Sequence, residues 1–154
     1  MTAVIAAATD LSVDAQTAWP AVTDWPSHSR WVAFTQVSAE RGCPVAGVGH
    51  RFTGRTSLGP LHFDDPMEVT RWRPPEPGSD GSLAPGYCRI VKRGKLVRGW
   101  AEITVTPRPG GCRVEWVEQV SIRGVPAFAD PVSGVLGSRL LKRVLRRMAI
   151  ELTA

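Results

Sequence analysis

The fold is decided by residues 87–122, which read YCRIVKRGKLVRGWAEITVTPRPGGCRVEWVEQVSI and alternate apolar with polar side chains in three runs. Alternation with a period of two is typical of a β-strand that buries one face. Gly94 and Lys95 separate the first two runs, and glycine at the first central position favours a two-residue hairpin turn. A turn rich in proline and glycine precedes the third run. We therefore expect three antiparallel strands in succession, near residues 87–93, 96–106 and 112–122.

Extended segments also lie upstream of this stretch. Residues 3–11 are small and apolar, and three later segments alternate like the strands above. Residues 73–86 hold four prolines and three glycines, which predicts a long exposed loop. The chain thus predicts one antiparallel sheet of seven strands, the upstream four lying near 3–11, 32–40, 49–58 and 61–72.

Helices are predicted in two places. Asp14 can cap a helix after the first strand, but Pro20 and Pro26 divide that region into two short, bent helices. Residues 131–154 carry the clearest helical pattern, and twenty residues of helix at roughly 1.5 Å each span about 30 Å. The apolar positions of that pattern recur at steps of three and four and are Val132, Val135, Leu136, Leu140, Leu141, Val144, Leu145, Met148 and Leu152.

One amphipathic helix covers only part of the face of a seven-stranded sheet. We therefore expect an α+β protein with a curved antiparallel sheet wrapped around a long C-terminal helix, and a gap between the two that can serve as a pocket. The chain of 154 residues has the length of one domain, and no second domain or internal repeat is visible, so we expect a single domain over 1–154.

Composition excludes several classes of protein. Apolar residues make up 43% and charged residues 21% of the chain, which is typical of a soluble globular protein. No apolar run is long enough for a membrane span, and no signal peptide is recognisable. The three cysteines are far apart, so we expect reduced thiols and a cytoplasmic location. No metal-ligand spacing, phosphate loop or nucleophile elbow is present, so we expect no cofactor; His28, His50 and His62 are expected at the surface.

The net charge of +5 is concentrated in the C-terminal helix. That segment carries Arg139, Lys142, Arg143, Arg146 and Arg147, against Glu151 alone. We interpret this stripe as a solvated outer helix face, with weak contact to an anionic surface as the alternative. The remaining elements are nearly neutral, so a stable nucleic-acid complex is not expected.

The chain resembles the START-like (SRPBCC) superfamily, and most of all the small bacterial polyketide cyclase/dehydratase-like proteins in it. The segments that carry the resemblance are residues 14–31, 48–75, 97–105 and 112–120, together with the basic C-terminal helix. The resemblance implies a helix-grip fold, a cavity for a hydrophobic ligand, and a pocket mouth gated by residues 124–131.

Alternation also assigns side chains to faces. Trp116 and Glu118 share the apolar side of their strand, as Asp65 does on its own. Buried carboxylates need hydrogen-bond donors, unless Asp65 lies at a bulge before Pro66 or both lie at strand ends. The strand at 87–93 can turn either Lys92 or the pair Arg89 and Arg93 inward. Glu118 and Asp65 are thus the candidate acid–base residues, and the candidate ligand-binding residues are Phe63, Met67, Lys92, Ala101, Ile103, Trp116, Leu136 and Leu140.

Three functions follow from these features. The first is binding of an apolar molecule, such as a lipid, an isoprenoid or a polyketide, between the sheet and the C-terminal helix. The second is a cyclase or dehydratase in which Glu118 or Asp65 acts as acid–base while Lys92 or Arg89 stabilises an enolate. The third is an interaction module that uses the basic helix on an anionic partner. The sequence leaves the ligand and the oligomeric state open.

Overall fold

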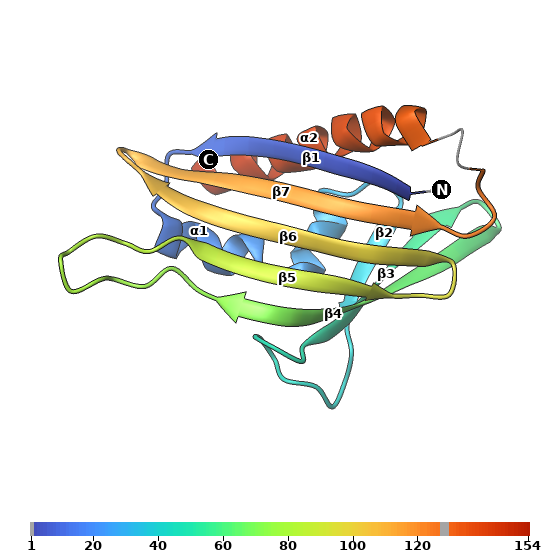
Figure 1. The fold of residues 1–154 in the computed structure, drawn as a ribbon, viewed down its shortest axis with the longest axis horizontal. Coiled ribbons are helices and arrows are strands. Elements are labelled where there is room, and N and C mark those ends of the chain that lie inside the picture. Colours follow the sequence, from blue (N-terminus) through green and yellow to red (C-terminus); the bar gives the residue numbers. More distant parts are fainter. Residues whose placement is uncertain (1, 127–129) are drawn as a thin grey trace.

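Seven antiparallel strands form one curved sheet in the order β1-β7-β6-β5-β4-β3-β2 (Figure 1). The structure is a computed structural model, and it describes residues 2–126 and 130–154. The predicted helix-grip fold is confirmed, because the long helix α2 (Asp130–Thr153) lies against the sheet. The strands are β1 (Thr2–Leu11), β2 (Thr35–Ala39), β3 (Arg51–Leu58), β4 (Leu61–Arg73), β5 (Gly86–Arg93), β6 (Val97–Arg108) and β7 (Gly111–Ile122).

The strand limits differ from the expected ones mainly at β2. Phe34 has a φ of 59°, in the left-handed region, so the chain turns there and the strand begins at Thr35. The segment between β4 and β5 is also more ordered than a plain exposed loop, since Pro77 and Leu83 form a bridge and Gly78 N–H donates to the Ser82 carbonyl at 2.7 Å. The β3–β4 and β5–β6 turns lie at the opposite end of the sheet from this loop (Figure 1).

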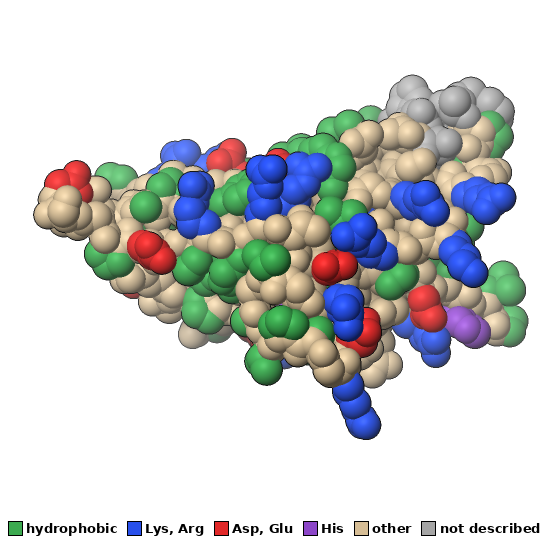
Figure 2. All heavy atoms as spheres, turned by 60° about the horizontal axis from the view of Figure 1, so that its bottom comes forward, with side chains coloured by type: hydrophobic (Ala, Val, Ile, Leu, Met, Phe, Trp, Pro, Cys, Tyr) green, Lys and Arg blue, Asp and Glu red, His purple; other side chains and the backbone are tan. Residues whose placement is uncertain are grey.

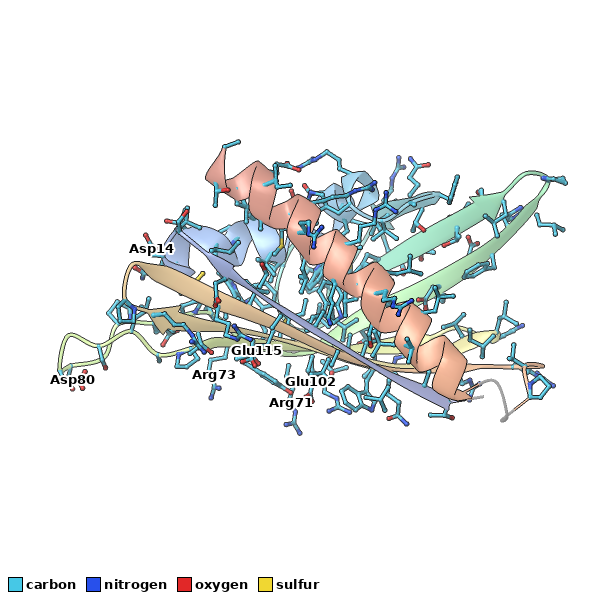
Figure 3. All side chains as sticks on the ribbon, turned by 90° about the horizontal axis from the view of Figure 1, so that it is seen from above. Asp14, Arg71, Arg73, Asp80, Glu102 and Glu115 are labelled. Atoms are coloured by element: carbon cyan, nitrogen blue, oxygen red, sulfur yellow. The ribbon has the colours of Figure 1, made fainter. Side chains whose placement is uncertain are left out.

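Two short helices follow β1, as expected. In α1 (Ala15–Val22), the Asp14 carboxylate accepts a hydrogen bond from Thr17 N–H at 2.8 Å, which is an N-cap. The 3₁₀-helix η1 (Trp25–Arg30) follows, with Pro26 in its first turn. Both helices lie on the same side of the sheet as α2 (Figure 3).

Helix α2 runs along the edge strand β1 (Figures 1 and 3). Small residues permit this approach: a Cβ at Gly137 would come within 2.5 Å of Ile5 Cδ1, and Ala6 N–H donates to Ser138 Oγ at 3.3 Å. Leu136 and Leu140 are exposed on this helix. The last turns enter the core through Leu141, Val144, Leu145 and Met148.

The C-terminal end of α2 is attached to η1. Trp31 Nε1–H donates to Glu151 Oε2 at 2.7 Å, and the Arg30 guanidinium forms an ion pair with the same carboxylate. Arg147 Nη1 donates to the Trp31 carbonyl at 3.4 Å. These contacts hold the C-terminal half of α2 and η1 over one end of the concave face. No described helix is both long and apolar enough to cross a membrane.

The convex face of the sheet carries charged and polar side chains. Arg71, Glu102 and Glu115 point away from α2 in Figure 3. Arg89 Nη1 lies 2.5 Å from Glu102 Oε1, and its guanidinium stacks 4.7 Å from the Trp100 ring centroid. Figure 2, which views the molecule from below, likewise shows basic and acidic side chains interspersed. Arg89 is therefore an outer residue, and it is Lys92 that β5 turns inward, with 7% of its side chain exposed.

Candidate functional site

A cavity of about 300 Å³ lies on the concave face of the sheet, between strands β2 to β7 and the 3₁₀-helix η1. Its wall is mostly apolar. The pocket was expected between the sheet and α2, but no described residue of α2 belongs to its lining. The lining residues are Trp25, His28, Val32, Thr35, Val37, Phe52, Gly54, Thr56, Phe63, Asp65, Met67, Ile90, Lys92, Val97, Ala101, Trp116, Glu118, Val120 and Ile122.

Most of the candidate residues meet at this one cavity. Those that line it are Phe63, Asp65, Met67, Lys92, Ala101, Trp116 and Glu118. Ile103 is fully buried in the core and is not among the lining residues. Leu136 and Leu140, which were also expected in the lining, are not among the described lining residues and are 56% and 55% exposed on α2. The small residues Gly134, Gly137 and Ser138 are the ones that approach β1.

Lys92 lies at the centre of a buried ionic cluster. Its Nζ is 2.5 Å from Asp65 Oδ2 and 3.0 Å from Glu118 Oε1. Only 15% of the Asp65 side chain and 17% of the Glu118 side chain are exposed. We name Asp65, Lys92 and Glu118 the polar cluster of the cavity. The two carboxylates that sequence alternation placed on apolar faces thus share one ammonium group.

The strand register explains how three separate strands supply this cluster. Lys92 on β5 is paired with Met67 on β4 and with Gly99 on β6. Glu118 lies on β7, beyond β6, and strands are about 4.8 Å apart. Gly99 and Ala101 present almost no side chain on the intervening strand, so the lysine can extend across β6 to Glu118. Asp65 is paired with Gly54 in an unbroken part of β4, and the register shift of that strand falls between Val69 and Arg71.

Burial perturbs the titration of this cluster. It raises the pKa of Asp65 above its ordinary value, against the opposing effect of the Lys92 charge, and the Glu118 charge raises it further. Burial opposes the charge of Lys92, but the two carboxylates outweigh it and raise the pKa of the ammonium. Asp65 Oδ1 is buried and lacks a hydrogen-bond partner in the described part of the chain. The ammonium of Lys92 therefore stays charged, and Asp65 takes up a proton more readily than an ordinary aspartate does.

His28 is a lining residue that the sequence did not reveal. It is 5% exposed, not at the surface as expected, and its ring lies 5.0–5.5 Å from the rings of Trp25, Trp31 and Trp116. Nε2 is 2.8 Å from the Val22 carbonyl, so that nitrogen carries the proton and donates. Burial lowers the pKa of His28. The tryptophans three residues before and after it were the available signal, since three residues make one turn of a 3₁₀-helix.

Other expectations have different outcomes. His50 is buried at 4% exposed, whereas His62 is exposed. The gate expected at residues 124–131 includes 127–129, which lie outside the described residues. The five basic side chains of α2 are all exposed, and their contact with an anionic surface stays a prediction.

Comparison with known proteins identifies the architecture. A START superfamily protein from Mycobacterium smegmatis is 13% identical with a TM-score of 0.65, covering 97% of this chain and 99% of that one. The chain has a START-like fold. The STAR-related lipid transfer protein from Xanthomonas axonopodis (14% identity, TM-score 0.66, 97% and 85% covered) has a similar structure. So has norcoclaurine synthase from Thalictrum flavum in complex with dopamine and hydroxybenzaldehyde (12%, 0.62, 99% and 87%). No protein-family model and no curated protein sequence matches the chain.

Proposed function

We propose that the chain binds an apolar small molecule in the cavity between the concave face of the sheet and η1. The cavity itself carries this proposal, because about 300 Å³ of space with a mostly apolar wall is costly to leave empty. The volume is at the lower end of the range for ligand pockets, roughly 300–1,000 Å³. At about 30 Å³ for each water-sized group, it accommodates on the order of ten heavy atoms.

The similar structures support a binding role for a fold of this kind. One neighbour is described as a lipid transfer protein, and another is a complex with dopamine and hydroxybenzaldehyde. Within this role we propose a lipid-, isoprenoid- or polyketide-like ligand. The cavity volume restricts it to small members of those classes or to the buried part of a larger one.

Isothermal titration calorimetry with 2-naphthylmethanol, a neutral bicyclic alcohol of matching size, tests the proposal. Binding is expected for the native chain and a loss of about tenfold or more for Ala101→Phe, which places a ring in the cavity. Ala8→Phe is the matched control, because Ala8 is exposed on β1. Val120→Phe is a second blocking variant if Ala101→Phe does not fold. Failure of the native chain to bind, or equal binding by a folded blocking variant, contradicts the proposal.

A second candidate is enzymatic proton transfer at the same cavity. The observation that favours it is two buried carboxylates beside a buried ammonium, an arrangement that can remove a proton next to a carbonyl and stabilise the enolate. Such a reaction would be of the cyclase or dehydratase type. Exchange of the α-protons of 2-tetralone in D₂O, followed by NMR, measures it directly. We expect the native chain to exchange these protons faster than buffer alone does. We expect Glu118→Gln to lower the exchange rate while the variant still binds the ketone. If the native chain exchanges the protons no faster than buffer, this candidate is removed.

A further inference from the structure

We infer that the cavity selects ligands whose polar end is an amine or another hydrogen-bond donor, and excludes carboxylates with the same apolar body. This inference rests on the proposed function, because it names the chemistry of the ligand that the cavity would bind. It is carried by the polar cluster of Asp65, Lys92 and Glu118, whose charges do not balance.

With both carboxylates ionised, the side chains of the cavity wall carry an excess of one negative charge. Among the described lining residues, Asp65 and Glu118 are acidic and Lys92 is the counter-ion. His28 favours its neutral form, since burial lowers its pKa. The arginines of β5 do not compensate the excess, because neither Arg89 nor Arg93 lines the cavity.

The hydrogen-bond donors of Lys92 are already engaged. An ammonium group has three N–H donors. Its Nζ lies 2.5 Å from Asp65 Oδ2, 3.0 Å from Glu118 Oε1 and 3.8 Å from Met67 Sδ. A carboxylate ligand would therefore have to displace one of these partners. It would also bring a third negative charge to one buried cation, where Coulomb repulsion is much stronger than in water.

The acceptors of the polar cluster, in contrast, have capacity to spare. Each carboxylate oxygen can accept more than one hydrogen bond. Asp65 uses Oδ2 for Lys92, while its Oδ1 is buried without a partner among the described residues. An ammonium or hydroxyl group on a ligand can supply the missing donor after a small rotation of the carboxylate. An ammonium also cancels the excess charge.

A matched set of three ligands tests this inference. They are 2-naphthylmethylamine, 2-naphthylmethanol and 2-naphthoate, which share one bicyclic body and are cationic, neutral and anionic at pH 7. Calorimetry is expected to give binding about tenfold or more tighter for the amine than for the carboxylate, with the alcohol between them. Glu118→Gln removes the excess charge and should narrow the ratio between amine and carboxylate by about tenfold. The control Glu115→Gln makes the same change on the outer side of β7 and should leave that ratio unchanged (Figure 3).

The outcomes separate this inference from the proposed function. If the alcohol binds but the carboxylate binds as tightly as the amine, the selectivity is refuted and the binding function stands. If none of the three ligands binds, the proposed function itself fails. If Glu118→Gln does not fold, Asp65→Asn makes the same test. If the ratio of amine to carboxylate affinity is unchanged in a folded variant of either residue, the role of the polar cluster is refuted.

Discussion

Replacing Lys92 by methionine should destabilise the protein far more than the loss of one surface charge does. Methionine has a similar length, so the change removes the ammonium and leaves Asp65 and Glu118 facing each other with little solvent around them. Removing one partner of a buried ion pair typically costs about 3–5 kcal/mol, because the other charge stays buried without compensation. That is a large share of the roughly 5–15 kcal/mol by which domains are stable. Arg93→Met is the matched control on the same strand; Arg93 pairs with Glu68 but is 55% exposed, so its loss should cost less than about 1 kcal/mol.

The cost of Lys92→Met should also depend on pH. Without the lysine charge, the pKa of Asp65, already raised by burial, rises further in the folded state. A carboxyl whose folded pKa exceeds its unfolded pKa favours the folded state at low pH, and this contribution is lost as the pH rises through the folded value. The variant should therefore regain stability relative to the native chain as the pH falls through the raised pKa of Asp65.

Urea unfolding followed by tryptophan fluorescence at several pH values measures both effects. The combined change Asp65→Asn, Lys92→Met and Glu118→Gln removes all three charges and should be more stable than Lys92→Met alone. The reasoning is refuted if Lys92→Met costs no more than Arg93→Met, or if its cost does not change with pH. Either result would mean that the polar cluster is hydrated in solution.

Three further predictions concern the rest of the molecule. Because burial lowers the pKa of His28, the native state binds fewer protons there than the unfolded chain does. The unfolding free energy should therefore fall by up to about 1 kcal/mol per pH unit below roughly pH 6.5. His28→Phe should flatten that slope in the same urea experiment. Gly99 has a φ of 137°, and a Cβ there would lie 1.8 Å from the Gln119 carbonyl oxygen. Gly99→Ala should therefore lower the unfolding free energy by about 2 kcal/mol or more. A loss below about 0.5 kcal/mol, roughly the size of an ordinary surface substitution, would contradict the backbone geometry. Asp14→Ala removes the N-cap of α1 and should cost about 1 kcal/mol in thermal unfolding, while an unchanged Tm would mean that the cap bond to Thr17 is not formed in solution.

The strand faces could be predicted from the sequence because the side-chain period of a strand is two. On β4, Phe63, Asp65 and Met67 share one face, and all three line the cavity as the alternation suggests. The bulge considered at Pro66 does not form, since Thr53 pairs with Pro66 in register. Alternation could not choose between Lys92 and Arg89 on β5, because both faces of that strand mix apolar and basic residues. The choice needs the neighbouring strands, where Gly99 leaves room for an inward lysine.

The orientation of α2 could not be predicted because its apolar positions extend around more than half of the helix. Such a pattern shows that the segment is helical without showing which side contacts the sheet. The small residues of α2 determine which side of the helix packs against β1, and such residues contribute little to a hydrophobic pattern. Gly134 and Gly137 allow the helix axis to approach β1, and Ser138 accepts a hydrogen bond from its backbone. Leu136 and Leu140 stay exposed beside these small residues.

The position of α2 also accounts for the position of the cavity. A helix that placed large side chains over the middle of the concave face would fill the space above Ala101 and Gly99. Instead its N-terminal half lies at the β1 edge, and the concave face is covered from the other side by the aromatic residues of η1, held to α2 through Trp31 and Glu151. The space that remains lies directly above β5 and β6, where Lys92 can reach carboxylates on both sides. The small residues of α2 and those of β6 thus act together: the first leave the cavity unfilled, and the second allow its polar cluster to assemble.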